Sequence, residues 1–63
     1  MLRQFKIYLK NFSPVFVSAT WVYKSGKYFC FEKSDPNTDF DYIVAQFRIK
    51  DVIGWKEVND NEI

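Results

Sequence analysis

Apolar and polar residues alternate with a period of two along most of this chain, and apolar residues at helical spacing are nearly absent. The clearest run covers residues 3–10, in which Phe5, Ile7 and Leu9 fall on one face of an extended strand. The intervening residues, Gln4, Lys6, Tyr8 and Lys10, fall on the other face. This pattern predicts an antiparallel β-sheet that packs one face against a core and leaves the other to solvent.

Turn-forming residues divide the alternating pattern into about five strands. We expect strands over residues 3–10, 15–23, 28–31, 42–49 and 54–58. Pro14 ends the first strand because it cannot continue a ladder, and Gly26 suits the positive φ of a tight hairpin turn. Residues 50–53 predict a single helical turn, and the alternative of a longer helix through residue 57 is opposed by Gly54.

Two of these strands differ in how clearly alternation assigns a buried face. In the fourth strand the residues expected to face the core are Ile43, Ala45, Phe47 and Ile49. In the second strand both faces carry β-branched and aromatic residues, so its inward face is ambiguous.

The order of elements predicts an all-β fold of about five antiparallel strands, arranged as a small barrel or a meander sheet. We expect a single β domain over residues 1–58 and a polar tail over residues 59–63 that frays. The layout resembles that of small SH3-like barrels. Residues 43–47 and 51–55 resemble the ends of very small β proteins of phages and prophages, which implies a host-directed or defence-directed binding role.

The residue types that most catalytic centres need are scarce in these 63 residues, which include no His, one Cys and two Gly. Cys30 has no His to act as its base, and its neighbours Phe29 and Phe31 predict burial as a small apolar residue. A zinc site would need further Cys or His ligands. The sequence therefore predicts a protein that is no enzyme and that holds neither a cofactor nor a metal.

Residues 35–41 follow the D-x-N-x-D-x-D spacing of the oxygen ligands that open a calcium-binding loop. Phe40 stands where that loop requires Gly, and Gln46 stands where it requires a bidentate Glu. We interpret the segment as a solvated turn between two strands.

Aromatic residues form 21% of the chain (Phe 7, Tyr 4, Trp 2), and a domain this short has little interior for them. Trp and Tyr are also the residues enriched where proteins bind one another. The sequence thus predicts a protein-interaction module, resembling a small phage-type inhibitor or adaptor, that binds another protein and forms a homodimer through exposed rings. The predicted contact residues are Trp21, Tyr23, Tyr28 and Trp55. The alternative is that so small a fold needs these rings merely to hold together.

Basic and aromatic residues are interleaved on the first three predicted strands, a pattern that suits single-stranded nucleic acid. The residues concerned are Lys6, Tyr8, Lys10, Lys24 and Lys27. A net charge of +1 opposes this second hypothesis, because nucleic-acid-binding domains are strongly basic. Lysines that protect a strand edge from unwanted pairing would give the same pattern.

The predicted location is the cytoplasm, without membrane association. Arg3 and Lys6 interrupt the N-terminal stretch where a signal peptide needs an apolar run, and no run approaches membrane-spanning length. An unpaired Cys also suits a reducing compartment.

Overall fold

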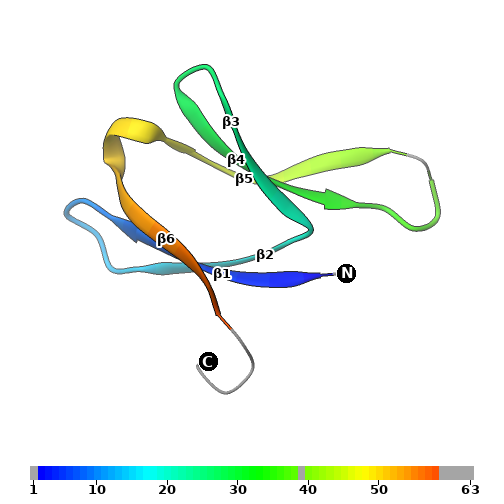
Figure 1. Cartoon of the computed structure of the whole chain (residues 1–63), viewed down its shortest axis with the longest axis horizontal. Helices are drawn as coiled ribbons and strands as arrows, with labels where there is room; N and C mark the ends of the chain where they lie inside the picture. Colours follow the sequence, from blue (N-terminus) through cyan, green and yellow to red (C-terminus); the bar gives the residue numbers. More distant parts are fainter. Residues whose placement is uncertain (1, 39, 59–63) are drawn as a thin grey trace.

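The computed structural model describes residues 2–38 and 40–58, and nearly all of them lie in β-strands. The elements are β1 (Arg3–Leu9), β2 (Val15–Ala19), β3 (Trp21–Ser25), β4 (Tyr28–Ser34), β5 (Asp41–Arg48), the 3-10 turn η1 (Ile49–Asp51) and β6 (Val52–Val58). They form two antiparallel three-stranded sheets, with strand orders β2-β1-β6 and β3-β4-β5 (Figure 1). The predicted all-β class is confirmed, as two small sheets rather than a closed barrel. The predicted tail lies outside the described residues.

The predicted second strand is two strands, because the chain leaves one sheet and enters the other at Thr20. The Thr20 N–H donates to the Glu32 carbonyl (2.8 Å), and Thr20 Oγ1 accepts from the Ser34 N–H (3.2 Å). The Thr20 carbonyl accepts from the Arg3 guanidinium at 3.2 Å. The inward face changes parity at this corner, from the odd-numbered residues of β2 to the even-numbered Val22 of β3. This change explains why the alternation of residues 15–23 was ambiguous.

One core joins the two sheets. Its fully buried members are Phe5, Ile7, Ala19 and Phe31. The rings of Phe5 and Phe31, which belong to different sheets, meet edge to face with centroids 5.5 Å apart. Phe47 packs against Phe31 in the same geometry at 5.8 Å. Edge-to-face ring pairs stabilise beyond the apolar area they bury. The Phe5–Phe31 contact therefore helps to hold the two sheets together, and Phe47 packs against Phe31 from within the same sheet.

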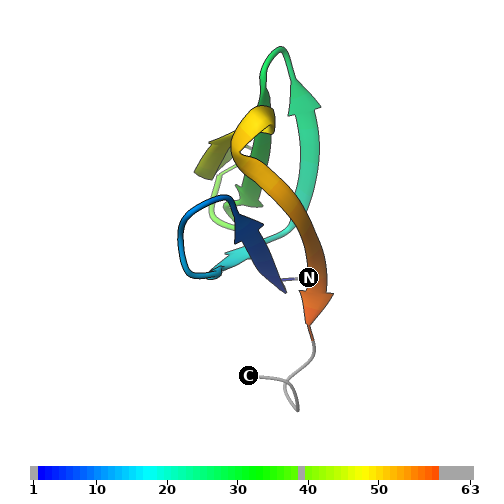
Figure 2. The same ribbon diagram turned by 90° about the vertical axis from the view of Figure 1, so that its left-hand side faces the viewer.

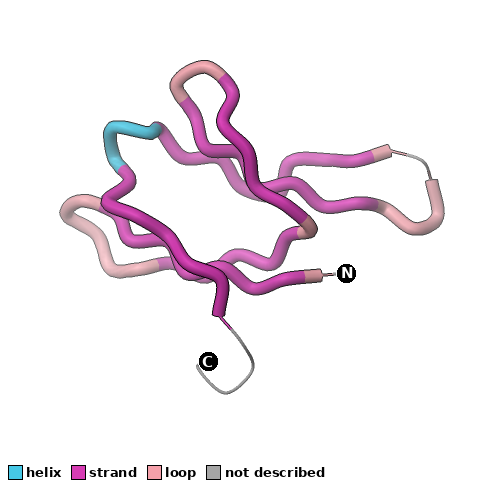
Figure 3. The backbone as a smooth tube through the Cα atoms, in the orientation of Figure 1, coloured by secondary structure: helices cyan, strands magenta, loops and turns pink. Residues whose placement is uncertain are grey.

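An extra residue in β5 overturns one expectation. Phe31 pairs with Ala45 and Glu32 pairs with Ile43, so Val44 has no partner in β4 and forms a β-bulge. A bulge reverses the alternation, and Ile43 therefore faces away from the core with 48% of its surface exposed. Beyond the bulge, the β4–β5 hairpin projects past the end of β3 (Figures 1 and 3).

The predicted turns are confirmed. Gly26 has a φ of 59° in the two-residue turn between β3 and β4. The single turn expected at residues 50–53 is η1, which lies slightly earlier, at Ile49–Asp51, so Ile49 belongs to the turn and not to the fourth strand as expected. The Ile49 N–H donates to the Lys27 carbonyl at 2.8 Å. Seen from the side the molecule is thin, with extents of 37 × 33 × 13 Å (Figure 2). The described part of the chain contains no helix that is long and apolar enough to span a membrane.

Candidate functional site

The face of the β3–β4–β5 sheet that is turned away from the core carries a cluster of aromatic and polar side chains. Because Phe31 points into the core, its neighbours Cys30 and Glu32 point outward. Their partners on β3 point outward with them, since Trp21 pairs with Glu32 and Tyr23 pairs with Cys30. We define the aromatic face as Trp21, Tyr23, Tyr28 and Glu32.

A single carboxylate holds two rings of this face. The Trp21 Nε1–H donates to Glu32 Oε1 at 2.9 Å, and the Tyr23 hydroxyl donates to Glu32 Oε2 at 2.8 Å. Both rings are nevertheless exposed, Trp21 by 40% and Tyr23 by 39%. The hydrogen bond from Tyr23, together with the negative charge of Glu32, raises the pKa of the Tyr23 hydroxyl above its usual value of 10.0. The two rings are thus fixed in position while their surfaces stay open to solvent.

Cys30 lies beneath this face, between Tyr23 on β3 and Gln46 on β5. Its side chain is buried, as the sequence predicts, although it does not belong to the contacting cluster of Phe5, Ile7, Ala19 and Phe31. Gln46 Nε2–H donates to its sulfur at 3.6 Å. The thiol is therefore covered by polar and aromatic neighbours of the outer face.

Three of the four predicted contact residues share the aromatic face, and the fourth does not. Trp55 lies on β6, in the other sheet, and its ring packs edge to face against Phe5 at 5.6 Å and against Phe31 at 6.1 Å. Trp55 is 37% exposed, so it closes one side of the core and keeps a surface in solvent. Sequence reasoning missed Glu32. The two-residue turn at Gly26 sets the register that places Glu32 beside both rings, and this was the signal that could have found it.

The five residues predicted for nucleic-acid binding are spread over the molecule. The Lys6 ammonium lies over the ring of Tyr8 (5.2 Å) and over that of Phe16 (5.7 Å), on the outer face of the β2-β1-β6 sheet. Lys24 instead lies over Phe29, at 5.7 Å, on the side of β3 that carries Val22. Lys10 is exposed just beyond β1. These four do not form one continuous surface with Lys27.

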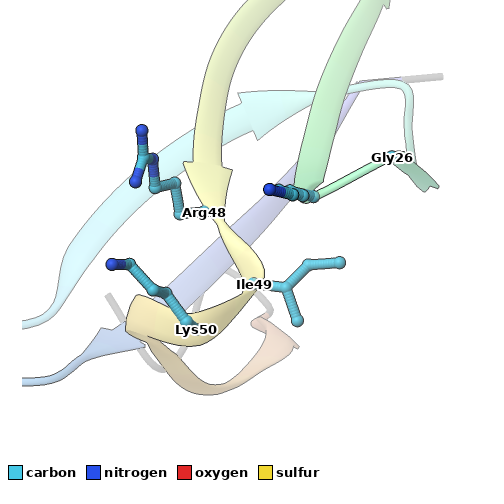
Figure 4. Close-up of a pocket in the computed structure, with 5 residues that line it drawn as sticks. Gly26, Arg48, Ile49 and Lys50 are labelled. Carbon is cyan, nitrogen blue, oxygen red and sulfur yellow. The ribbon is translucent and has the colours of Figure 1, made fainter.

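Lys27 stands in the turn between β3 and β4, next to two further cations. It lines an open hollow of about 440 Å³ together with Gly26, Arg48, Ile49 and Lys50. Figure 4 shows the Arg48 and Lys50 side chains extending to the same side of this hollow, with Ile49 turned away from them. Arg48 is also the cross-strand neighbour of Tyr28, so the basic hollow adjoins the aromatic face.

The segment with calcium-like spacing forms hydrogen-bonded turns. Asp35 Oδ1 accepts from the Asn37 N–H at 2.9 Å, and the Asp35 carbonyl accepts from the Thr38 N–H at 3.3 Å. Asp39 lies outside the described residues. Within residues 2–38 and 40–58, no three side chains of His, Cys, Asp or Glu gather where they could hold a metal ion.

Comparison with protein-family models, with curated proteins and with solved structures found no match for this chain.

Proposed function

We propose that this protein is a non-catalytic interaction module of the cytoplasm that binds a partner protein through its aromatic face. The observation that carries the proposal is the pair of exposed rings held by Glu32. A small domain stabilises itself by burying its rings, whereas Trp21 and Tyr23 expose about two-fifths of their surface and have their polar atoms satisfied within the chain. Rings that are already ordered lose little conformational entropy when a partner covers them.

The charge around this face indicates which partner would suit it. The hollow beside Tyr28 is lined by three basic residues, Lys27, Arg48 and Lys50. A partner that places an apolar surface on the rings and acidic groups over the hollow would be complementary to both. The inhibitor or adaptor role and the self-association expected from the sequence belong to the same proposal.

The test is affinity capture from the native host with the wild-type chain and with Trp21→Ala and Tyr23→Ala variants. We expect the wild type to retain a partner that both variants lose, while far-UV circular dichroism shows that the variants remain folded. Phe12→Ala is the matched control, because Phe12 is 75% exposed in the loop between β1 and β2. Retention of every captured protein by both folded variants would refute the proposal.

One observation supports a second candidate, the binding of single-stranded nucleic acid. Lys6 between the rings of Tyr8 and Phe16 combines a cation with two stacking surfaces. A gel-shift series with an oligonucleotide checks it, because binding by phosphate contacts weakens steeply as salt is added. If this candidate function is right, the wild type gives a gel shift with the oligonucleotide and Lys6→Glu abolishes that shift. An absent or salt-insensitive shift removes it.

A further inference from the structure

β5 is an outer strand of its sheet, and within the described residues its free edge pairs with no other strand. Exposed strand edges are usually protected by lysines, prolines or short length. The other outer strands carry such features: Lys24 in β3, Lys56 in β6, and a span of five residues directly after Pro14 in β2. Between its terminal residues β5 reads Tyr-Ile-Val-Ala-Gln-Phe and contains no charge or proline. The bulge at Val44 is a further device that can protect an edge, but in charge, proline and length β5 is the least protected of the four outer strands.

The side chains along this edge are apolar and open to solvent. Tyr42 is 46% exposed, Ile43 is 48% exposed and Val44 is 39% exposed. They lie where the β4–β5 hairpin begins to project beyond β3 (Figure 3). A strand laid along β5 would cover these residues and satisfy the free hydrogen-bonding groups at the same time.

The charges at the two ends of β5 indicate which strand fits. Asp41 begins the strand and Arg48 ends it. Suppose that β5 of a second copy lies antiparallel beside this strand, with the two-fold axis passing between Val44 and Ala45. Each Asp41 then faces Arg48 of the other copy. Two-fold symmetry forms this oppositely charged pair twice. The edge is thus complementary to itself.

Because of the bulge, this register also places side chains of the same sheet face opposite each other. Asp41 and Arg48 pair with Ser34 and Tyr28 of β4, which both lie on the outer face. On the opposite face, Tyr42 of one copy would stand across from Phe47 of the other, as an aromatic cross-strand pair. If all eight residues of β5 alternated regularly, without the bulge at Val44, Asp41 and Arg48 would face opposite sides of the sheet and this register would mix the two faces.

We infer that two copies of this chain associate through their β5 edges and join their β3-β4-β5 sheets into one continuous sheet. The inference rests on the self-association in the proposed function and deepens it by naming the surface. Both aromatic faces then lie on the same side of the joined sheet. The dimer would present two copies of the aromatic face to a partner, which raises avidity when both can engage.

Sedimentation equilibrium across the micromolar range tests the register by charge reversal. Asp41→Arg or Arg48→Asp alone places like charges opposite each other twice, and we expect each to weaken dimerisation by about tenfold. The double variant Asp41→Arg/Arg48→Asp restores opposite charges and should return the dissociation constant to near that of the wild type. Lys10→Asp is the matched control for Arg48→Asp, because it makes the same charge change at an exposed residue just beyond β1, in the other sheet, and should leave dimerisation unchanged.

Two further variants separate this inference from the rest of the proposed function. Val44→Lys places a charge at the centre of the β5 edge and should abolish the dimer, whereas Trp21→Ala should leave the dimer intact while it removes partner binding. A wild type that stays monomeric at high micromolar concentration overturns the inference. So does a dimer that survives Val44→Lys, or single and double charge variants that behave alike. A dimer lost in Trp21→Ala and kept in Val44→Lys places self-association on the aromatic face instead, which refutes the β5 register and leaves the proposed function standing.

Discussion

Glu32, which is not among the contact residues predicted from the sequence, contacts two of the exposed rings that are. Each of its two carboxylate oxygens accepts one hydrogen bond, from Trp21 and from Tyr23. Without these bonds the two rings would have more freedom to rotate, and a partner would have to order them at an entropic cost. In the proposed function the carboxylate would therefore act on binding indirectly, by holding the rings that would touch the partner.

Replacing Glu32 should shift the titration of Tyr23. The pKa of Tyr23 is raised in the folded state, so folding favours the protonated hydroxyl. The contribution of this shift to the free energy of unfolding is therefore complete below pH 10, the ordinary pKa of Tyr, and is lost as the pH rises through the raised pKa. Glu32→Gln removes the negative charge, and we expect the Tyr23 pKa to fall towards its usual value. A pH titration of the Tyr23 ring resonances by NMR measures this change. Glu57→Gln, which alters a carboxylate paired with Arg3 on the other sheet, is the control. An unchanged Tyr23 pKa in Glu32→Gln would show that the hydrogen bond is not formed in solution.

At the scale of strands and turns, the local pattern predicted most of the fold. Alternation located the strands, and Gly26 identified the tight hairpin with its positive φ. The corner at Thr20 and the bulge at Val44 were not predicted, because neither carries the Gly or Pro that marks a break. The corner at Thr20 is where the chain passes between the two sheets, and the bulge is an irregularity in the pairing of β4 with β5.

The two glycines should respond differently to the same substitution. Gly26 has a φ of 59°, and Gly54 has no positive φ, while a Cβ at either position would meet no atom within 4 Å. Gly26→Ala should lower the free energy of unfolding by about 1 kcal/mol, since a side chain disfavours the left-handed conformation. Gly54→Ala, within β6, should raise it by about 0.5 kcal/mol or leave it unchanged, because glycine weakens a strand interior. Urea denaturation measures both. Equal effects would mean that backbone conformation does not distinguish the two positions.

The candidate site was partly predictable, because the local pattern that predicted the β3–β4 hairpin also predicted which of its residues share a face. Trp21, Tyr23 and Tyr28 belong to one hairpin, so its register brings them to one face. Trp55 is separated because β6 belongs to the other sheet, and only the packing of the two sheets places its ring against Phe5 and Phe31. The sequence pattern predicted which residues share a face within one hairpin, but it did not predict which residues contact each other between the two sheets.

At the scale of the whole molecule, stability depends on very little interior. The molecule is only 13 Å across its shortest dimension, and its radius of gyration of 12.1 Å exceeds the roughly 10.6 Å typical of a compact chain of this length. The two sheets share the ring cluster of Phe5, Phe31, Phe47 and Trp55. Neither three-stranded sheet has a second apolar layer of its own, so we expect them to unfold together.

The two tryptophans allow a direct test, because each reports on a different sheet. Trp55→Phe leaves Trp21 as the fluorescent probe of the β3-β4-β5 sheet, and Trp21→Phe leaves Trp55 as the probe of β6 and the core. Within each variant, at one protein concentration, the urea midpoint from fluorescence should coincide with that from far-UV circular dichroism, as in two-state unfolding. If Trp55 lost its native fluorescence at lower urea than the circular dichroism signal, the β2-β1-β6 sheet would be detaching first. The shared ring cluster would then be too weak to couple the sheets, and any dimer built on β5 would have to be stable without the β2-β1-β6 sheet.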